Sequence, residues 1–354
     1  MSTRRWGIVW IALLLWLAVL AVAGATAAAP TGPRLAVEVA RPYPQLDGIE
    51  TVGPAGENPQ LLIGGGGEDA VHPNGDRPAW SPDGSQLAFT SSFGEYSPVV
   101  YLVGAEGGRP RLLSKTTPLS EPLFMADGRF LAFSALRVVK GEFRRPARRS
   151  DDSYGVVVDW AVLAYGVDGN SARLLTPWRR NQAIRPTSFS PDGSTMAAER
   201  ETRTGVDAVT IDLDSGHTRL LARDATEPVY SPDGSQVAFV RTSRRAPSEP
   251  GGNRPPASSR LLVIPAVGGA PVELARIKGG LAWPSWDPSG QRLAFTRIGG
   301  GSFGGTSHPH EGNSVMQVNA DGTCLATLLE IRRGSFYGSA WQPGAGREAG
   351  PISC

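Results

Sequence analysis

Residues 78–89 read PAWSPDGSQLAF, and close copies of this stretch recur along the chain. Full copies begin at Pro186 (PTSFSPDGSTMAAERE), Pro228 (PVYSPDGSQVAFVRT) and Pro284 (PSWDPSGQRLAFTRI). A degenerate copy, PLFMADGRFLAFSA, begins at Pro122, and a truncated copy, SAWQPG, ends at Gly344. Recurrence of one unit is the signature of a repeat architecture, in which each unit is one supersecondary element.

The spacing of the copies identifies that element. Their central turn falls at Asp83, Asp127, Asp192, Asp233, Ser289 and Gly344, in steps of 44, 65, 41, 56 and 55 residues. A base period of just over forty residues, lengthened three times by insertions, fits one four-stranded blade of a β-propeller. A content of 44 glycines and 30 prolines, with only 19% charged residues, also suits many short strands joined by tight turns.

Each copy has the pattern of two strands joined by a tight turn. The first strand ends in an aromatic residue or methionine that can pack between sheets: Trp80, Met125, Phe189, Tyr230, Trp286 or Trp341. Pro-Asp-Gly then forms the turn, because proline presets φ and glycine accepts a positive φ. The next strand, Leu87-Ala88-Phe89 in the first copy, supplies buried apolar side chains.

The two ends of the repeat region predict how the ring closes. RLAVEVA from Arg34 resembles a second strand, and GIETVGPAGENPQLLI from Gly48 resembles a third and a fourth strand. SAWQPG supplies the missing first strand. We therefore expect an all-β fold: a six-bladed β-propeller of four-stranded antiparallel blades over residues 34–344. N-terminal strands pairing with the C-terminal strand would close it and leave no free edge.

The repeat resembles the propeller of TolB and its relatives, which share this W-S-P-D-G…L-A-F pattern. The resemblance covers residues 34–344 and concerns the propeller alone, without the additional N-terminal domain of TolB. It implies an interaction scaffold, and it carries no catalytic residue onto this chain. Enzymes of the prolyl-oligopeptidase type share the repeat, but we expect no hydrolase domain here.

The N-terminal segment, residues 1–29, predicts export. Arg4 and Arg5 precede an apolar stretch over residues 6–23, and small residues follow, as in a secretory signal. The stretch is also long enough to span a bilayer, so a cleaved signal and an uncleaved membrane anchor both remain open. The twin arginines leave the twin-arginine export route open beside the general one. A periplasmic, envelope-associated or secreted protein is expected.

Two cysteines, Cys324 and Cys354, are the only ones in the chain. Cys324 is expected in the turn between the third and fourth strands of the fifth blade, and the tail over residues 345–354 can carry Cys354 back to it. In an oxidising compartment a disulfide is the natural interpretation.

The three insertions, residues 138–155, 243–258 and 297–312, predict a binding face. Each falls between the second and third strands of its blade, so all three lie on the face that also carries the blade-to-blade connections. Loops held by a rigid scaffold are where binding usually resides, and arginine and aromatic residues are enriched in recognition surfaces. The residues predicted for this basic and aromatic face are Arg144, Arg145, Trp178, Arg179, Arg180, Arg332, Arg333 and Tyr337.

We therefore expect a non-catalytic binding module that holds a protein partner, an anionic polymer or a lipid headgroup on this face. Neither a cofactor nor a catalytic residue is expected, and a monomer is favoured because a closed ring has no edge to hide. A net charge of +2 gives no bulk attraction for nucleic acid.

The alternative function is a metal-dependent hydrolase or lyase that acts on a polysaccharide. His308 and His310 form the only cluster of metal-ligand type, although solvent-facing loop histidines are the simpler interpretation. A G-x-S-x-G match at residues 300–304 lies in a glycine-rich loop and lacks the strand and helix of a nucleophile elbow, so it does not indicate a serine hydrolase.

Overall fold

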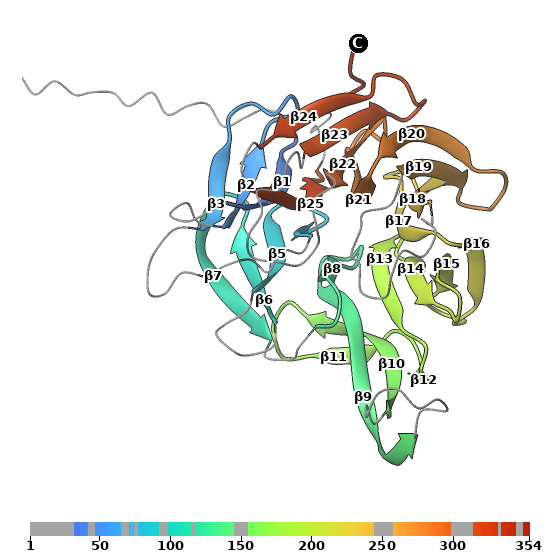
Figure 1. Cartoon of the computed structure of the whole chain (residues 1–354). Coiled ribbons are helices and arrows are strands. Elements are labelled where there is room, and N and C mark those ends of the chain that lie inside the picture. Colours follow the sequence, from blue (N-terminus) through green and yellow to red (C-terminus); the bar gives the residue numbers. More distant parts are fainter. Residues whose placement is uncertain are drawn as a thin grey trace, which may run out of the picture. The chain divides into compact units, whose positions relative to one another are not determined.

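Six antiparallel sheets follow one another along the chain and form the six predicted blades, as the computed structural model shows (Figure 1). The structure describes residues 32–41, 47–64, 71, 73, 77–91, 98–114, 118–144, 155–243, 258–298, 314–331, 334–344 and 350–354. They belong to one compact unit, Gly32–Cys354. No helix among the described residues is long and apolar enough to cross a bilayer.

The first three blades run from the innermost to the outermost strand in chain order. The first blade comprises β4 (Ala79–Trp80), β5 (Gln86–Ser91), β6 (Val99–Gly104) and β7 (Gly107–Ser114). The second comprises β8 (Leu123–Phe124), β9 (Phe130–Arg144), β10 (Gly155–Gly166) and β11 (Ala172–Leu174), with β12 (Arg179–Arg180) also paired to β10. The third comprises β13 (Ile184–Phe189), β14 (Thr195–Glu201), β15 (Val206–Asp212) and β16 (Thr218–Ala222).

The remaining blades complete the ring and confirm the predicted closure. The fourth comprises β17 (Thr226–Tyr230), β18 (Gln236–Thr242), β19 (Ser258–Pro265) and β20 (Val272–Lys278). The fifth comprises β21 (Gly280–Trp286), β22 (Arg292–Ile298), β23 (Ser314–Asn319) and β24 (Ala326–Glu330). The sixth joins the C-terminal strand β25 (Ser335–Trp341) to β1 (Leu35–Ala40), β2 (Gly48–Val52) and β3 (Gln60–Gly64), so strands from the two ends of the unit lie side by side (Figure 1).

The core is divided among the junctions between blades. One cluster of buried apolar residues fills each of the six junctions. The Leu-Ala-Phe strand explains this, because successive side chains point to opposite faces of a sheet. Leu87 and Phe89 pack toward the sixth blade, whereas Ala88 packs toward the second. The Leu-Ala-Phe strand of each blade therefore contributes to both of the junctions beside it.

The repeated turn is held by the same hydrogen bonds in each of three blades. Asp83 accepts from the Ser81 hydroxyl (2.6 Å) and the Ser85 amide (3.0 Å), and Asp192 and Asp233 repeat both contacts. These bonds hold the pKa of each turn carboxyl below its usual value, with the serine hydroxyl as the largest cause. The repeated aspartates therefore stabilise the turns, which is a structural role.

One prediction about the repeat was wrong. The innermost strand of the second blade ends at Phe124 and not at Met125, whose amide donates to the Phe130 carbonyl (2.9 Å). The Ser81 amide makes the same bond to Gln86 in the first blade. Met125 therefore occupies the serine position of the turn. Met125 nevertheless packs in the buried cluster between the second and third blades, as predicted.

The C-terminal tail is tied to the fifth blade as predicted. A disulfide joins Cys324, in the turn between β23 and β24, to Cys354. Asn319 adds a second attachment, since its side-chain amide donates to the Ile352 carbonyl (2.9 Å) and its side-chain oxygen accepts from the Ile352 amide (2.8 Å). The last residues are therefore fixed by one covalent bond and a matched pair of hydrogen bonds.

The first insertion differs from the loop that the sequence predicts. Residues 138–144 and Gly155 continue the strands β9 and β10, which pair as far out as Arg144 and Gly155. A β-bulge between Val156 and Val158 interrupts the pairing. The second blade therefore projects a long hairpin, and residues 145–154 lie outside the described part.

Candidate functional site

The strands present two different faces to solvent. The turn face is formed by the Pro-Asp-Gly turns and their equivalents at residues 82–84, 126–128, 191–193, 232–234, 288–290 and 343–344. The loop face is formed by the segments that enter the innermost strands, at residues 77–78, 121–122, 185–186, 227–228, 283–284 and 337–338. The predicted binding residues belong to the loop face.

Polar and aromatic side chains meet where the innermost strands begin on the loop face. We call them the axial cluster: Arg77, Glu121, Arg185, Glu199, Glu227, Trp283 and Tyr337. All seven are partly buried, and together they come from all six blades. An Arg77 guanidinium nitrogen donates to the Thr187 carbonyl (2.8 Å), which links the first blade to the third. Contacts between blades that are not neighbours place the cluster on the propeller axis.

Irregular backbone aims two of these side chains. The pairing of β17 with β18 shifts register between Thr226 and Val229, and β21 shifts between Ala282 and Ser285. Glu227 and Trp283 lie in these bulges with φ of 54° and 56°. Bulges re-aim side chains, and a positive φ is uncommon for residues other than glycine. Such local strain is typical of functional positions.

A chain of hydrogen bonds connects three blades inside the cluster. The Glu227 amide donates to the Glu199 carboxylate (2.8 Å), and the Trp283 amide donates to the Glu227 carboxylate. Arg185 lies 3.6 Å from the other Glu199 oxygen. The Trp283 ring in turn meets the Tyr337 ring edge-on, with 6.4 Å between centroids.

Burial makes the two central carboxyls hard to ionise. Loss of hydration and, second to it, the neighbouring Glu199 charge raise the pKa of Glu227 from 4.5 to about 8, although Arg77 and the Trp283 amide oppose this shift. Burial also raises the pKa of Glu199, although the Glu227 amide and Arg185 oppose this. At neutral pH Glu227 therefore carries a proton and can donate a hydrogen bond.

A cavity opens beside the cluster at the first three blades. Its volume is about 380 Å³, and Glu121 and Arg185 line it together with Thr90 and Ser120. A carboxylate and a guanidinium thus face the same small space on the loop face. Such a space can hold a ligand that presents both an acceptor and a donor.

A separate aromatic and charged group lies on the second blade and includes three of the predicted residues. The Arg137 guanidinium stacks on the Trp178 ring at 4.7 Å and contacts Asp159 at 3.0 Å. Arg180 lies 3.6 Å from the same carboxylate, so Asp159 pairs with both arginines. Arg179 is exposed beside it.

The other predicted residues fall into two groups. Tyr337 lies in the axial cluster, and the backbone of Arg144 lies in β9. Arg145, Arg332, Arg333, His308 and His310 lie outside the described residues. No group of three or more metal-ligand side chains occurs within the described part. The predicted loop-face site and the predicted histidine site therefore stay predictions.

Sequence reasoning missed most of the axial cluster, although a signal was present. Five of the six innermost strands are entered through a residue followed by proline: Arg77-Pro78, Glu121-Pro122, Arg185-Pro186, Glu227-Pro228 and Trp283-Pro284. The residue before the proline thus alternates between Arg and Glu in the first four blades. The fold keeps the turn residues constant, but it does not require a particular side chain at this position. A position that varies between copies is therefore a candidate for a functional role.

Comparison with known proteins supports the fold. No family model matches the chain, and no curated protein matches it. Among solved structures, TolB of Acinetobacter baumannii has a TM-score of 0.62 and 17% identity, over 88% of this chain and 67% of that one. A structure assigned to TolB of Agrobacterium tumefaciens has a TM-score of 0.57 and 18% identity, over 90% and 93% of the two chains.

A nidogen/laminin complex provides a further neighbour, with a TM-score of 0.54 and 14% identity over 88% of this chain and 98% of that one. At these identities the likeness concerns the fold alone. The chain therefore contains a six-bladed β-propeller with the fold of TolB propellers, as its repeat indicates.

Proposed function

We propose that this chain is an exported, non-catalytic binding propeller that holds a segment of a protein partner at the loop face. The axial cluster carries the proposal, because the innermost strands repeat their turns yet differ at these positions. Partly buried Arg and Glu side chains around one axis offer paired donors and acceptors in a low-dielectric setting, where charged hydrogen bonds are strong.

The mixture of charges favours a polypeptide over a uniformly anionic polymer. Arg77 and Arg185 can bind carboxylates, whereas Glu121 repels them. A segment that carries both signs satisfies both sets, and the partly buried Trp283 and Tyr337 rings add apolar contact area. Protein capture at this face also agrees with the scaffold role that the TolB resemblance implies.

Two features support export. A disulfide joins Cys324 and Cys354, and such bonds persist in oxidising compartments. The apolar stretch over residues 6–23 suits a signal or an anchor, and it lies outside the described residues. Together they favour a protein that acts in the periplasm, at the cell envelope or outside the cell.

Site-specific photo-crosslinking in producing cells tests the proposal. A photoreactive phenylalanine analogue replaces Leu119, which lines the cavity beside Glu121. A matched control places it at Leu325, an exposed leucine of the turn face. We expect a discrete protein adduct from position 119 only, and its loss when Arg185→Ala is added. Equal adduct yields at both positions, or an adduct at position 119 that is unchanged by Arg185→Ala, would contradict binding at the axial cluster.

The outer part of the loop face has its own test. Replacing Arg179, Arg180, Arg332 and Arg333 with alanine removes the predicted basic surface and leaves the axial cluster in place. An adduct at position 119 that disappears in this folded variant extends the site to that surface. An unchanged adduct restricts the site to the axis.

A further inference from the structure

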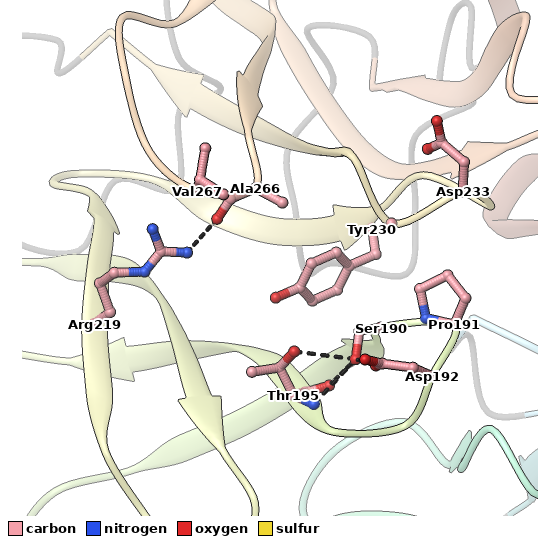
Figure 2. Close-up of a pocket in the computed structure, with 10 residues that line it drawn as sticks. Ser190, Pro191, Asp192, Thr195, Arg219, Tyr230, Asp233, Ala266 and Val267 are labelled. Carbon is pink, nitrogen blue, oxygen red and sulfur yellow. Dashed lines mark hydrogen bonds between the residues drawn. The ribbon is translucent and has the colours of Figure 1, made fainter.

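The turn face has a cavity at the junction of the third and fourth blades, remote from the proposed loop-face site. Its volume is about 500 Å³, and the third blade contributes Ser190, Pro191, Asp192, Thr195 and Arg219 to its lining. The fourth blade contributes Tyr230, Asp233, Gly234, Ala266 and Val267. Figure 2 shows the Tyr230 ring between the two blades, with its hydroxyl on the side of Arg219 and Thr195.

Arg219 brings to this cavity a positive charge that makes no ion pair with a described residue. Its guanidinium donates to the Ala266 carbonyl across the junction, which fixes its position (Figure 2). Within the described part of the chain no carboxylate lies within ion-pair distance of it. Tyr230 is 8% exposed as a whole residue, and none of the described residues hydrogen-bonds its hydroxyl. A guanidinium fixed by a backbone carbonyl and a hydroxyl without a partner among the described residues therefore line the same cavity.

An equivalent junction shows which features belong to the architecture. Between the first and second blades, Arg111 donates to the Val167 carbonyl at 2.8 Å, just as Arg219 donates to Ala266. Val167 and Ala266 are equivalent, because their amides donate to the residue after the turn glycine in their own blades. The arginine-to-carbonyl bond alone is therefore a structural clamp and indicates no ligand.

The two junctions differ at the positions that matter for binding. Tyr230 corresponds to Phe124, which has no hydroxyl, because both end the innermost strand. Val267 corresponds to Asp168, whose carboxylate accepts from the Asn170 amide at 3.0 Å. The residue after the carbonyl that Arg111 binds is thus acidic, whereas the residue after the carbonyl that Arg219 binds is an 88% exposed valine. The third-to-fourth junction combines the clamp with a tyrosine hydroxyl and an apolar rim.

The two turn carboxylates in the lining do not remove this difference. Asp192 is held in its own turn by Ser190 (2.5 Å) and Ser194 (3.0 Å), and Asp233 by Ser231 and Ser235. Equivalent aspartates, Asp83 and Asp127, stand at the first-to-second junction. Figure 2 shows the Asp233 carboxylate directed away from the Tyr230 ring, so an anion beside Arg219 avoids it.

We propose that this cavity binds a carboxylate that carries a small apolar group, such as the C-terminal carboxylate of a peptide ending in alanine. The Arg219 guanidinium and the Tyr230 hydroxyl receive the carboxylate oxygens, as charge-assisted hydrogen bonds favour. Val267, Ala266 and Pro191 cover the apolar group. Binding here does not depend on a ligand at the loop face.

Ligand-observed NMR on the purified full-length protein, with N-acetyl-alanine as the probe and N-acetyl-alaninamide as its neutral control, tests the site. We expect saturable binding of the acid and none of the amide. Arg219→Gln should weaken binding about tenfold or more, as loss of a charge-assisted bond does, and Tyr230→Phe several-fold. Arg111→Gln removes the same clamp elsewhere and should leave binding unchanged.

Exchange of residues between the two junctions separates binding from folding. Val267→Asp places an acid beside Arg219 at an exposed position and should abolish binding while the melting temperature stays constant. The reciprocal double variant Phe124→Tyr and Asp168→Val should create a second site, so that the protein binds two molecules of the acid instead of one. Equal binding of acid and amide, equal loss in Arg111→Gln and Arg219→Gln, or full binding in Val267→Asp would overturn the proposal.

Discussion

The turn face and the loop face of the propeller follow opposite rules. On the turn face, Ser81-Pro82-Asp83-Gly84 recurs with the same hydrogen bonds at residues 190–193 and 231–234. On the loop face, the equivalent entry positions hold Arg77, Glu121, Glu227 and Trp283. Repetition indicates a requirement of the fold, and variation at a fixed position indicates a role that the fold does not impose. Changes in the repeated turns should therefore act on stability, whereas changes at the entry positions of the loop face should act on the pH dependence of stability and on binding.

The largest effect should come from Gly84→Val on the turn face. Gly84 has a φ of 69°, its carbonyl accepts from the Gln342 side chain at 2.7 Å, and a Cβ there would overlap the Pro343 carbonyl. Positive φ and overpacking together should cost about 4 kcal/mol in urea unfolding. Gly216→Val is the control, because Gly216 has a φ of 70° and no neighbour within 4 Å. Equal losses would show that the contact with the C-terminal strand contributes nothing.

Loss of the disulfide should have the next largest effect. The double variant Cys324→Ala and Cys354→Ala opens a loop with a sequence separation of 30 residues. The chain-entropy estimate for such a loop is about 3 to 4 kcal/mol of unfolding free energy. Wild-type protein with the disulfide reduced should match the variant in denaturant midpoint. Crosslinking from position 119 should persist in the folded variant. Its loss would show that binding at the loop face depends on the disulfide on the turn face.

The pH dependence of stability should identify Glu227 on the loop face. Its pKa is raised from 4.5 to about 8 in the folded state, so the folded chain binds more protons than the unfolded chain between these values. Stability should therefore fall as pH rises through this window, by at most about 1.4 kcal/mol per pH unit from this group. Glu227→Gln should flatten the slope.

Glu273→Gln is the matched control for that experiment. Glu273 is an outer-strand carboxyl whose pKa is lowered, mainly by its hydrogen bond to Arg276, so its replacement should leave the slope between pH 5 and 8 unchanged. A slope that survives Glu227→Gln would show that the axial carboxyls are not the proton-binding groups.

The smallest effect should come from the turn aspartates. Asp233→Ala removes the acceptor of Ser231 (2.6 Å) and Ser235 (3.0 Å), and exposed hydrogen bonds of this kind are worth about 1 kcal/mol. Because the folded pKa is lowered, this contribution is present at neutral pH and is lost as the solution becomes acidic. Asp83→Ala and Asp192→Ala should give the same loss, and a marked difference would show that the three turns are not equivalent.

The repeat allowed the blades, the closure and the disulfide to be predicted from sequence, because each follows from local spacing. The axial cluster could not be predicted in the same way. The bond from Arg77 to Thr187 joins residues 110 positions apart and exists only because the ring closes. The burial that raises the pKa of Glu227 cannot be recognised from the residues around Glu227 in the sequence, and neither can the proximity of Glu199.

Local chemistry also misled in two places. Met125 is apolar and stands where other copies have serine, so it resembled the last core residue of its strand, which is Phe124. The insertion at residues 138–155 was interpreted as a loop, yet Val138 and Val156 extend the β9–β10 hairpin. Strand pairing continued past the core because the hairpin supplies its own hydrogen bonds.

The pairing of β25 with β1 has a consequence for the order of synthesis. Strands β1 to β3 emerge first, but the inner neighbour of β1 is encoded by Ser335–Trp341 near the end of the chain. Until that segment is made and delivered, β1 keeps an open edge that could pair with another chain. A nascent or truncated chain is thus prone to aggregation until Ser335–Trp341 pairs with β1.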